Sequence, residues 1–137
     1  MITLQVGVKA FLKDNEGKYL LLKRNPEKYN NVKGSWDLVG GRIDPGSSLF
    51  ENLKREVKEE TQLGITSVPK LIAAQDILHH EGSHVVRLTY IAECSGDIVL
   101  DLTENTEFKW LTLEELRTQI DLDTFVKELA DDSMLFS

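Results

Sequence analysis

The amino-acid sequence predicts a layered α/β or α+β domain, in which a mixed β-sheet packs against helices. Segments rich in β-branched and apolar residues recur along the chain and are bounded by Asn, Asp, Gly and Pro, which is typical of strands. Two helix-start patterns, Ser-x-x-Glu and Thr-x-x-Glu, follow such segments. At 137 residues, with 41% hydrophobic and 28% charged residues, the chain has the size and composition of one globular domain, residues 1–137.

The beginning of the chain predicts a β-hairpin. Residues 2–12 are rich in β-branched and apolar types, and so are residues Tyr19–Arg24. Between them, Asp14–Gly17 supplies the Asp, Asn and Gly residues that favour a turn. We therefore expect two antiparallel strands joined by this turn.

A loop and a short strand are expected next. Residues 25–35 are rich in Asn, Pro, Lys and Gly, which predicts a surface loop. Lys28 and Lys33 lie in this loop, which either closes over a substrate or is simply exposed. Trp36–Val39 predicts a short strand that leads into a pair of glycines.

The strongest helix signal begins at Ser48. Ser48 and Glu51 match a capping box, in which each residue satisfies a backbone N–H of the first helical turn. Leu49, Leu53 and Val57 follow at intervals of four residues, so they are expected to form one apolar stripe that faces a core.

The same helix carries three glutamates beside the apolar stripe. Glu56, Glu59 and Glu60 are spaced i, i+3 and i+4, and residues at this spacing share one helical face. Like charges there, close to the end where the helix dipole disfavours anions, destabilise a helix unless a cation neutralises them. Oxygen-only ligands suit Mg²⁺ or Mn²⁺. The alternative to a metal site is an acidic helix face that is simply solvated. The glycine-rich loop before the helix favours the metal site over this alternative.

The second half of the chain predicts further strands and then helices. Strands are expected at residues 69–78, 85–94, 98–100 and 106–111, and helices at residues 113–117 and 123–129, the first of them after a Thr112–Glu115 capping box. The polar loop between the first two of these strands contains His79, His80, Glu81 and His84. These four residues lack a fixed helical spacing, so we interpret them as loop residues rather than metal ligands.

Charge and cysteine content exclude several classes of protein. The net charge of −7 argues against general nucleic-acid binding and against an anionic-membrane surface, whereas a metal-bound phosphorylated substrate is compatible with it. The single cysteine, Cys94, excludes an internal disulfide and lies in an apolar run, where we expect a small buried hydrophobe. No apolar run reaches the roughly 18 residues of a membrane span and no signal-peptide pattern is present, so we expect a cytoplasmic protein.

Residues Gly41–Leu63 resemble the Nudix box, usually written G-x5-E-x7-R-E-U-x-E-E-x-G-U, in which U is an apolar residue. The first glycine is Gly41, and the pairs Arg55–Glu56 and Glu59–Glu60 occupy the Arg-Glu and Glu-Glu positions, with Val57 as the apolar residue between them. A match of this length is far more specific than a lone glycine motif.

Two positions depart from the box. Ser47 stands where the pattern has a glutamate, which removes one carboxylate that the family often uses around its metals. Ser47 either accepts a hydrogen bond from a metal-bound water or lies near the helix cap. Gln62 stands where the pattern has a glycine, and we expect Gly64 to supply the helix C-cap instead.

The resemblance implies the Nudix α/β/α sandwich with a mixed β-sheet, and hydrolysis of a nucleoside diphosphate linked to another group X with Mg²⁺ or Mn²⁺ as cofactor. Glu59 and Glu60 would bind the metal, and Glu56 would bind metal or act as the base that activates water. Arg55 would orient a carboxylate through a charge-assisted bond. The expected partner is a small phosphorylated substrate.

Further site residues are expected around these carboxylates. Gly40 and Gly41 would let the backbone lie close to a metal-bound phosphate. Arg24 and Arg42 either contact phosphates or are solvated. Trp36 is expected in the core or in an edge strand rather than stacked on a base.

Glu104 and Glu107 precede Trp110 in a segment that resembles the region where many family members place an additional carboxylate. One of them is therefore a candidate metal ligand or base, with a surface position as the alternative for each. A metal-dependent pyrophosphohydrolase is the leading hypothesis, and a non-catalytic nucleotide-binding module, favoured by Ser47, is the rival. The identity of X and the oligomeric state stay open, and a homodimer is allowed.

Overall fold

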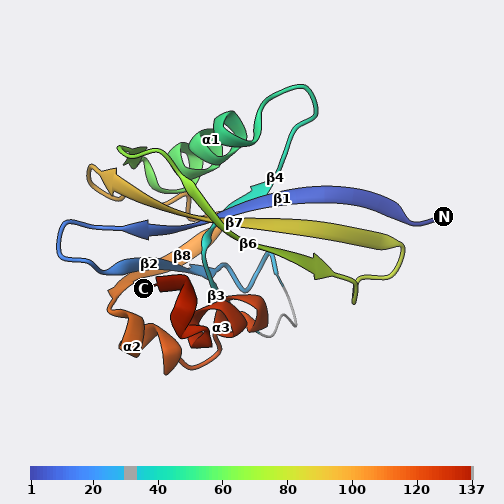
Figure 1. The fold of residues 1–137 in the computed structure, drawn as a ribbon. Coiled ribbons are helices and arrows are strands. Elements are labelled where there is room, and N and C mark those ends of the chain that lie inside the picture. The colour runs from blue at the N-terminus through green and yellow to red at the C-terminus, as the bar shows by residue number, and fades with distance from the viewer. Residues whose placement is uncertain (30–33, 137) are drawn as a thin grey trace.

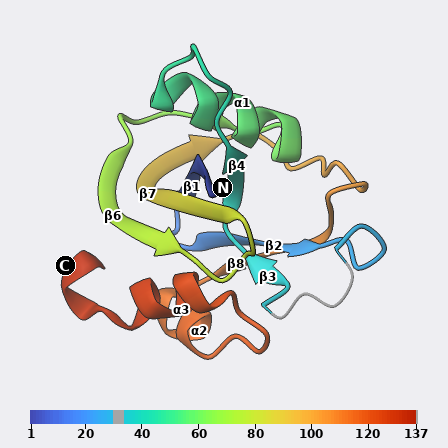
Figure 2. The same cartoon turned by 90° about the vertical axis from the view of Figure 1, so that its right-hand side faces the viewer.

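The computed structural model describes residues 1–29 and 34–136, so Lys33 and the adjoining part of the predicted loop lie outside the described residues (Figure 1). The elements in chain order are β1 (Thr3–Lys13), β2 (Tyr19–Arg24), β3 (Trp36–Asp37), β4 (Val39–Arg42), α1 (Leu49–Thr61), β5 (Gly64–Ile65), β6 (Lys70–Ile77), β7 (Ser83–Ser95), β8 (Asn105–Leu111), α2 (Leu113–Arg117), α3 (Thr124–Asp131) and a 3₁₀ turn (Ser133–Phe136). Helix α1 covers one side of the sheet, and α2 and α3 cover the other, as Figure 2 shows from a second direction. This is the predicted α/β sandwich. Among the described helices, none is both long and apolar enough to cross a membrane.

Strand β1 lies at the centre of the sheet. It runs parallel to β7 from Thr3 opposite Ser83 to Lys13 opposite Glu93, and antiparallel to β4. Strand β6 continues the sheet beyond β7, and β2 pairs with β8 and β3, each time in antiparallel fashion. Parallel and antiparallel pairs occur together, which confirms the predicted mixed sheet. The predicted strands at residues 69–78, 85–94 and 106–111 are confirmed to within one or two residues.

The expected β-hairpin is only partly present. The chain reverses at Asp14, whose Oδ1 accepts hydrogen bonds from Glu16 N and Lys18 N, but the two strands are in register only at Lys13 and Tyr19. Beyond this point β1 joins β4 and β7, whereas β2 joins β3 and β8. Both strands carry buried apolar side chains on successive residues, so both faces of each strand must pack against other parts of the chain. Elements distant in the sequence provide this packing.

The single short strand expected at Trp36–Val39 is divided at Leu38. Strand β3 pairs with β2, and β4 pairs with β1, so the chain changes its neighbour between the two strands. The Asp37 carboxylate accepts the Leu38 backbone N–H at 2.7 Å. This local bond satisfies the donor at the point where the ladder is interrupted.

The strand expected at residues 98–100 does not form. Val99 N donates to Thr61 O at 3.0 Å, and Asp101 N donates to Glu60 O at 3.4 Å. The backbone of this segment therefore satisfies the last carbonyls of α1, which have no partner within the helix. Its apolar side chains, Ile98 and Leu100, pack on the core beside α1.

Helix α1 begins at the predicted residue, with only the Ser48 half of the predicted capping box. Ser48 is its N-cap, and Ser48 Oγ accepts the Glu51 N–H at 3.1 Å. Leu53 and Val57 are fully buried, whereas Leu49, in the first turn, is 39% exposed and lies outside the apolar stripe predicted for it. The Thr112–Glu115 capping box at α2 is confirmed in both directions.

The C-terminal end of α1 differs from the prediction. Gln62 itself is the C-cap, in the left-handed conformation with φ 64°, and its N–H bonds Lys58 O. Gly64, expected to take this role, begins β5 opposite Ser95 instead. A left-handed residue must follow the last helical turn directly, so a glycine two positions later comes too late to serve.

Replacing Gln62 by glycine is expected to stabilise the fold. A residue without a Cβ adopts the left-handed conformation without steric penalty, and the Gln62 side chain is exposed. We expect the free energy of unfolding to rise by about 0.5–1 kcal/mol. Urea denaturation of the two proteins measures this difference, and an unchanged or lower midpoint would contradict it.

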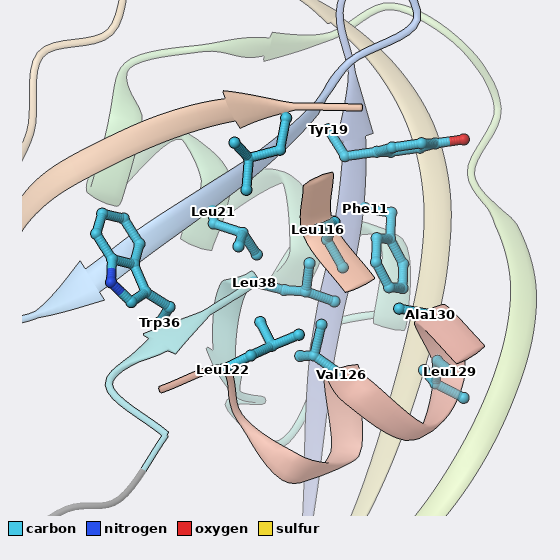
Figure 3. Close-up of a cluster of buried hydrophobic side chains, with 11 residues drawn as sticks. Phe11, Tyr19, Leu21, Trp36, Leu38, Leu116, Leu122, Val126, Leu129 and Ala130 are labelled. Atoms are coloured by element: carbon cyan, nitrogen blue, oxygen red, sulfur yellow. The ribbon is translucent and has the colours of Figure 1, made fainter. Parts of the chain in front are cut away.

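Two apolar clusters fill the spaces on either side of the sheet. Figure 3 shows the cluster between the sheet and helices α2 and α3, which includes Phe11 and Trp36 from the strands and Val126 from α3. Trp36 is 6% exposed, which confirms its expected place in the core. The second cluster joins β1 and β2 to Leu53 and Val57 of α1. Packing on this cluster fixes α1, and with it the glutamate stripe, against the sheet.

Candidate active site

A cavity of about 720 Å³ opens beside the end of α1 and contains most of the predicted site residues. Its walls come from β1, β4, α1, the β6–β7 region and the segment before β8. The predicted residues that line it are Arg24, Gly40, Gly41, Arg42, Glu56, Glu59, Glu60 and Glu104. The structure thus gathers residues that lie far apart in the chain around one space.

The two glycines place α1 close to β1 and β4. Gly40 has φ 142°, and a Cβ there would lie 2.0 Å from Val8 O on β1, so the position requires glycine. A Cβ on Gly41 would lie 2.8 Å from Glu56 Oε2. Because these two glycines have no Cβ, the glutamate side chains of α1 can lie against β4.

Glu60 is the most enclosed carboxylate of the stripe. Its Oε2 accepts Gly40 N–H at 3.0 Å, and its Oε1 accepts the Asn105 amide at 3.2 Å. Burial raises the pKa of Glu60 to about 7, and the nearby Lys9 ammonium opposes the rise. Burial also raises the pKa of Glu56, with Arg55 acting in the opposite direction. Two partly desolvated carboxylates beside each other form a site that favours a cation.

This pKa shift predicts how stability depends on pH without added metal. The folded chain binds the Glu60 proton more tightly than the unfolded chain does, so the free energy of unfolding should fall as pH rises from about 4.5 to about 7. The loss attributable to Glu60 is on the order of 3 kcal/mol. Urea titrations at several pH values with EDTA measure it, and the Glu60→Gln variant should show a shallower fall. Parallel pH curves for the two proteins would contradict the assignment.

Glu59 lies at the rim, with a side chain that is 59% exposed. Within the described residues, no three carboxylate, imidazole or thiolate side chains converge tightly enough to hold an ion by themselves. Glu56, Glu59 and Glu60 still supply an all-oxygen donor set on one wall of the cavity. Such a set fits Mg²⁺ or Mn²⁺, because these ions keep several waters and take substrate oxygens as further ligands.

Arg55 lies directly behind the carboxylates. Its Nη1 is 3.2 Å from Glu56 Oε1 and 3.6 Å from Glu59 Oε2, and its Nη2 donates to Asn52 Oδ1 at 2.8 Å. The guanidinium is thus within ion-pair distance of Glu56, the carboxylate that the family resemblance implies it orients. The neighbouring Asp44 carboxylate lies 3.4 Å from Nη2.

The structure separates the two carboxylates predicted outside the box. Glu104 lines the cavity, where Lys28 and the Tyr29 hydroxyl both donate hydrogen bonds to it. The Lys28 hydrogen bond holds the pKa of Glu104 below its usual range, so this carboxylate is a poor proton acceptor. Glu107 lies outside the cavity lining, on β8, where it pairs with Lys23 at 3.3 Å.

Another part of the cavity wall is a buried network of charges that the sequence-based prediction did not identify. Asp37, 2% exposed, receives hydrogen bonds from Arg87 Nη2 at 2.6 Å and from Arg24. Lys9 Nζ lies 3.2 Å from the same carboxylate, and Arg87 Nη1 reaches Asp123 at 3.2 Å. Burial alone would raise the pKa of Asp37, but the three cations outweigh it and hold the pKa well below its usual range.

A sequence signal for this network does exist. Lys9 and Arg87 each interrupt an apolar strand, and a charge in such a strand is buried only with a partner. Arg24, a predicted phosphate-binding residue, donates hydrogen bonds from its Nη atoms to Asp37 and to Gly34 O. Arg42, the other predicted phosphate-binding residue, is exposed at the rim. Both arginines do line the cavity.

The histidine loop does not form a metal cluster among the described residues. His84 Nε2 lies 2.7 Å from Asp76 Oδ1, and the ring of His79 stacks on Phe125, while His80 lines the cavity. Cys94 is half-buried rather than fully buried as expected, and burial raises the pKa of its thiol to about 11, which disfavours the reactive thiolate.

Comparison with known proteins identifies the family. The model of the NUDIX domain matches residues 3–131. A nucleoside triphosphatase NudI from Enterobacter sp. (strain 638) is 34% identical over 114 residues, which cover 76% of this chain and 79% of that protein. The human 8-oxo-dGDP phosphatase NUDT18 is 32% identical over 94 residues, which cover 69% of this chain and 26% of that protein.

Solved structures show the same fold. The crystal structure of a MutT protein from Methanosarcina mazei Go1 superposes with a TM-score of 0.82 at 26% identity, covering 95% of this chain and 92% of that one. A MutT NUDIX hydrolase from Burkholderia pseudomallei superposes with a TM-score of 0.79 at 22% identity, covering 96% and 98%. With the match over residues 3–131, these likenesses show that the chain belongs to the Nudix family and is a pyrophosphohydrolase of that family.

Proposed function

We propose that the protein hydrolyses the pyrophosphate bond of a nucleoside diphosphate linked to a group X, with Mg²⁺ or Mn²⁺ as cofactor. The observation that carries the proposal is the convergence of Glu56 and Glu60 on Gly40 and Gly41 of β4 at one wall of a 720 Å³ cavity. The same cavity is lined by Lys9, Arg24 and Arg87. A polyphosphate bound there would thus meet both the bound cation and cationic side chains.

Each residue of the carboxylate wall has a distinct role in this proposal. Glu59 and Glu60, with Glu56 beside them, would hold the divalent cation, which supplies positive charge to the phosphate oxygens when bound. Glu56 accepts the proton of the attacking water, because it is partly desolvated and its pKa is raised. Arg55 keeps the Glu56 carboxylate in one orientation. Glu104 is less suited to be the base, because Lys28 and Tyr29 already occupy its oxygens.

The relatives support a nucleotide as the substrate. They are named a nucleoside triphosphatase and an 8-oxo-dGDP phosphatase, so we place a nucleoside di- or triphosphate first among the candidates for this chain. The net charge of −7 supports a small substrate rather than a nucleic acid. The proposal includes one domain over residues 1–137 and a cytoplasmic location, for which the single cysteine, which excludes an internal disulfide, is support.

A homodimer is compatible with the sheet, since β6 pairs only with β7 among the described strands and so presents an open edge. Light scattering coupled to size-exclusion chromatography measures the mass in solution. A monomeric mass would remove this part of the proposal and leave the catalytic part untouched.

A substrate panel tests the catalytic proposal. Nucleoside triphosphates, dinucleoside polyphosphates, nucleotide sugars and ADP-ribose are incubated with the protein and Mg²⁺ or Mn²⁺, and the products are separated by ion-exchange chromatography. We expect metal-dependent cleavage between two phosphates of at least one compound, with EDTA abolishing it. Tight binding of one compound without turnover of any would favour the rival, a non-catalytic nucleotide-binding module.

A further inference from the structure

Asn52 is a fully buried polar residue near the N-terminal end of the buried side of α1. Its Oδ1 accepts hydrogen bonds from Asp44 N and from Arg55 Nη2, both at 2.8 Å. Its Nδ2 donates to Ser48 O at 2.8 Å and to Ser47 O at 3.2 Å. Both the oxygen and the nitrogen of the amide are thus hydrogen-bonded. These bonds offset the free-energy cost of burying a polar side chain.

These bonds join three parts of the site. The donor side of Asn52 fastens the loop of residues 44–48 to the first turn of α1. The acceptor side holds Nη2 of Arg55, while Nη1 of the same guanidinium contacts Glu56. Because a guanidinium is planar and rigid, fixing one nitrogen fixes the direction of the other. The position of Asn52 therefore determines where Arg55 meets Glu56.

Asn52 also contacts the residue that replaces the glutamate of the box, Ser47. Ser47 is exposed in the loop that Asn52 fastens, and its carbonyl accepts the Asn52 amide. The charged partner of Arg55 on this side is Asp44, at 3.4 Å, and its side chain is 71% exposed, so water screens its charge. The buried and well-formed contact to Nη2 is the one from Asn52.

We propose that Asn52 is a positioning residue, which anchors Arg55 so that the guanidinium holds the Glu56 carboxylate, in a box that has Ser47 where a glutamate is usual. A neutral anchor has a chemical consequence. An amide oxygen directs the guanidinium without neutralising its charge, so the charge remains available to Glu56 and Glu59. The proposal rests on the proposed hydrolase function of the same site.

Two substitutions of similar size separate positioning from packing. Asn52→Leu removes the acceptor for Arg55 and the donor for the loop together. Asn52→Asp keeps the acceptor but places a carboxylate oxygen against Ser47 O and Ser48 O, where the amide donated. Both variants should therefore melt at a lower temperature than the wild type. The proposal predicts that kcat falls about 10- to 100-fold in Asn52→Leu with little change in KM, and falls less in Asn52→Asp, which keeps the anchor but draws part of the Arg55 charge away from Glu56.

Ser48→Ala is the matched control for a loss of stability alone. It deletes the N-cap bond to Glu51 N but keeps the Ser48 carbonyl and every contact of Arg55. This variant should melt lower than the wild type while its kcat is unchanged. Circular dichroism of each variant at the assay temperature verifies that the protein measured is folded.

A double-mutant cycle with Arg55→Ala identifies the route of the effect. If Asn52 acts through Arg55, the double variant Asn52→Leu/Arg55→Ala should be no slower than Arg55→Ala, because the anchored group is already absent. Two effects that multiply in full, or a folded Asn52→Leu variant with wild-type kcat, would overturn the inference. Absence of turnover by the wild type on every compound of the panel would instead overturn the proposed function, so the two failures are distinguishable.

Discussion

Replacing Glu60 by glutamine is expected to lower Mg²⁺-dependent turnover roughly 100-fold or more. Glu60 is the carboxylate held most firmly, by Gly40 N–H and by Asn105, and the substitution removes its charge while preserving its size. The variant should be folded and, above pH 7 without metal, at least as stable as the wild type, because burial of the charge is what raises the pKa of Glu60. Initial rates as a function of Mg²⁺ concentration measure the effect.

The other box carboxylates and a surface residue complete this experiment. Glu59→Gln is also expected to lower Mg²⁺-dependent turnover. Solvent screens the charge of the exposed Glu59 side chain. Glu128→Gln, on the exposed side of α3, changes the net charge by the same amount and should leave kcat unaltered. Added Mg²⁺ should raise the melting temperature of the wild type and of Glu128→Gln more than that of Glu60→Gln. Unchanged turnover in both Glu59→Gln and Glu60→Gln would rule out the metal site proposed on α1.

Replacing Arg87 by methionine is expected to lower the free energy of unfolding by about 3–5 kcal/mol. Arg87 is 4% exposed, and its guanidinium bonds both Asp37 and Asp123. Its removal leaves Asp37 buried with only Arg24 and Lys9, and Asp123 without its buried partner. Equilibrium urea denaturation followed by tryptophan fluorescence measures the change, since Trp36 lies next to Asp37 in the core.

An exposed ion pair gives the comparison for this result. Lys23 and Glu107 pair at 3.3 Å, with side chains that are 37% and 57% exposed. Lys23→Met should change the free energy of unfolding by less than about 1 kcal/mol, because water already solvates both charges. If Arg87→Met were no more destabilising than Lys23→Met, the network would contribute nothing to folding, and its charges would have to be explained by the substrate alone.

Local signals in the sequence predicted the elements that depend on neighbouring residues. The N-cap and periodicity of α1 are set within a few residues, and Ser48, Leu53 and Val57 lie where the sequence placed them. The carboxylate stripe could be predicted for the same reason, since Glu56 and Glu60 share a helical face. The direction in which that face points was supplied by the family pattern rather than by spacing.

Features that depend on distant partners could not be predicted in this way. The hairpin of β1 and β2 opens because β7 and β8, much later in the chain, supply their neighbours. Residues 98–100 have the apolar character of a strand, but their N–H groups bond the end of α1. The Asp37–Arg87 pair joins residues 50 positions apart, and only the folded sheet brings them together.

The parallel pairing of β1 with β7 also sets an order of events for folding. Thr3 meets Ser83, so the central strand of the sheet acquires this neighbour only after roughly 80 further residues have left the ribosome. Contacts of such sequence separation are slow to form, because closing the intervening chain costs entropy before any apolar surface is buried. Until then β1, which carries Lys9, presents an open apolar edge that a chaperone can bind. The nascent chain should therefore become protease-resistant abruptly, when β7 has emerged, rather than gradually along its length.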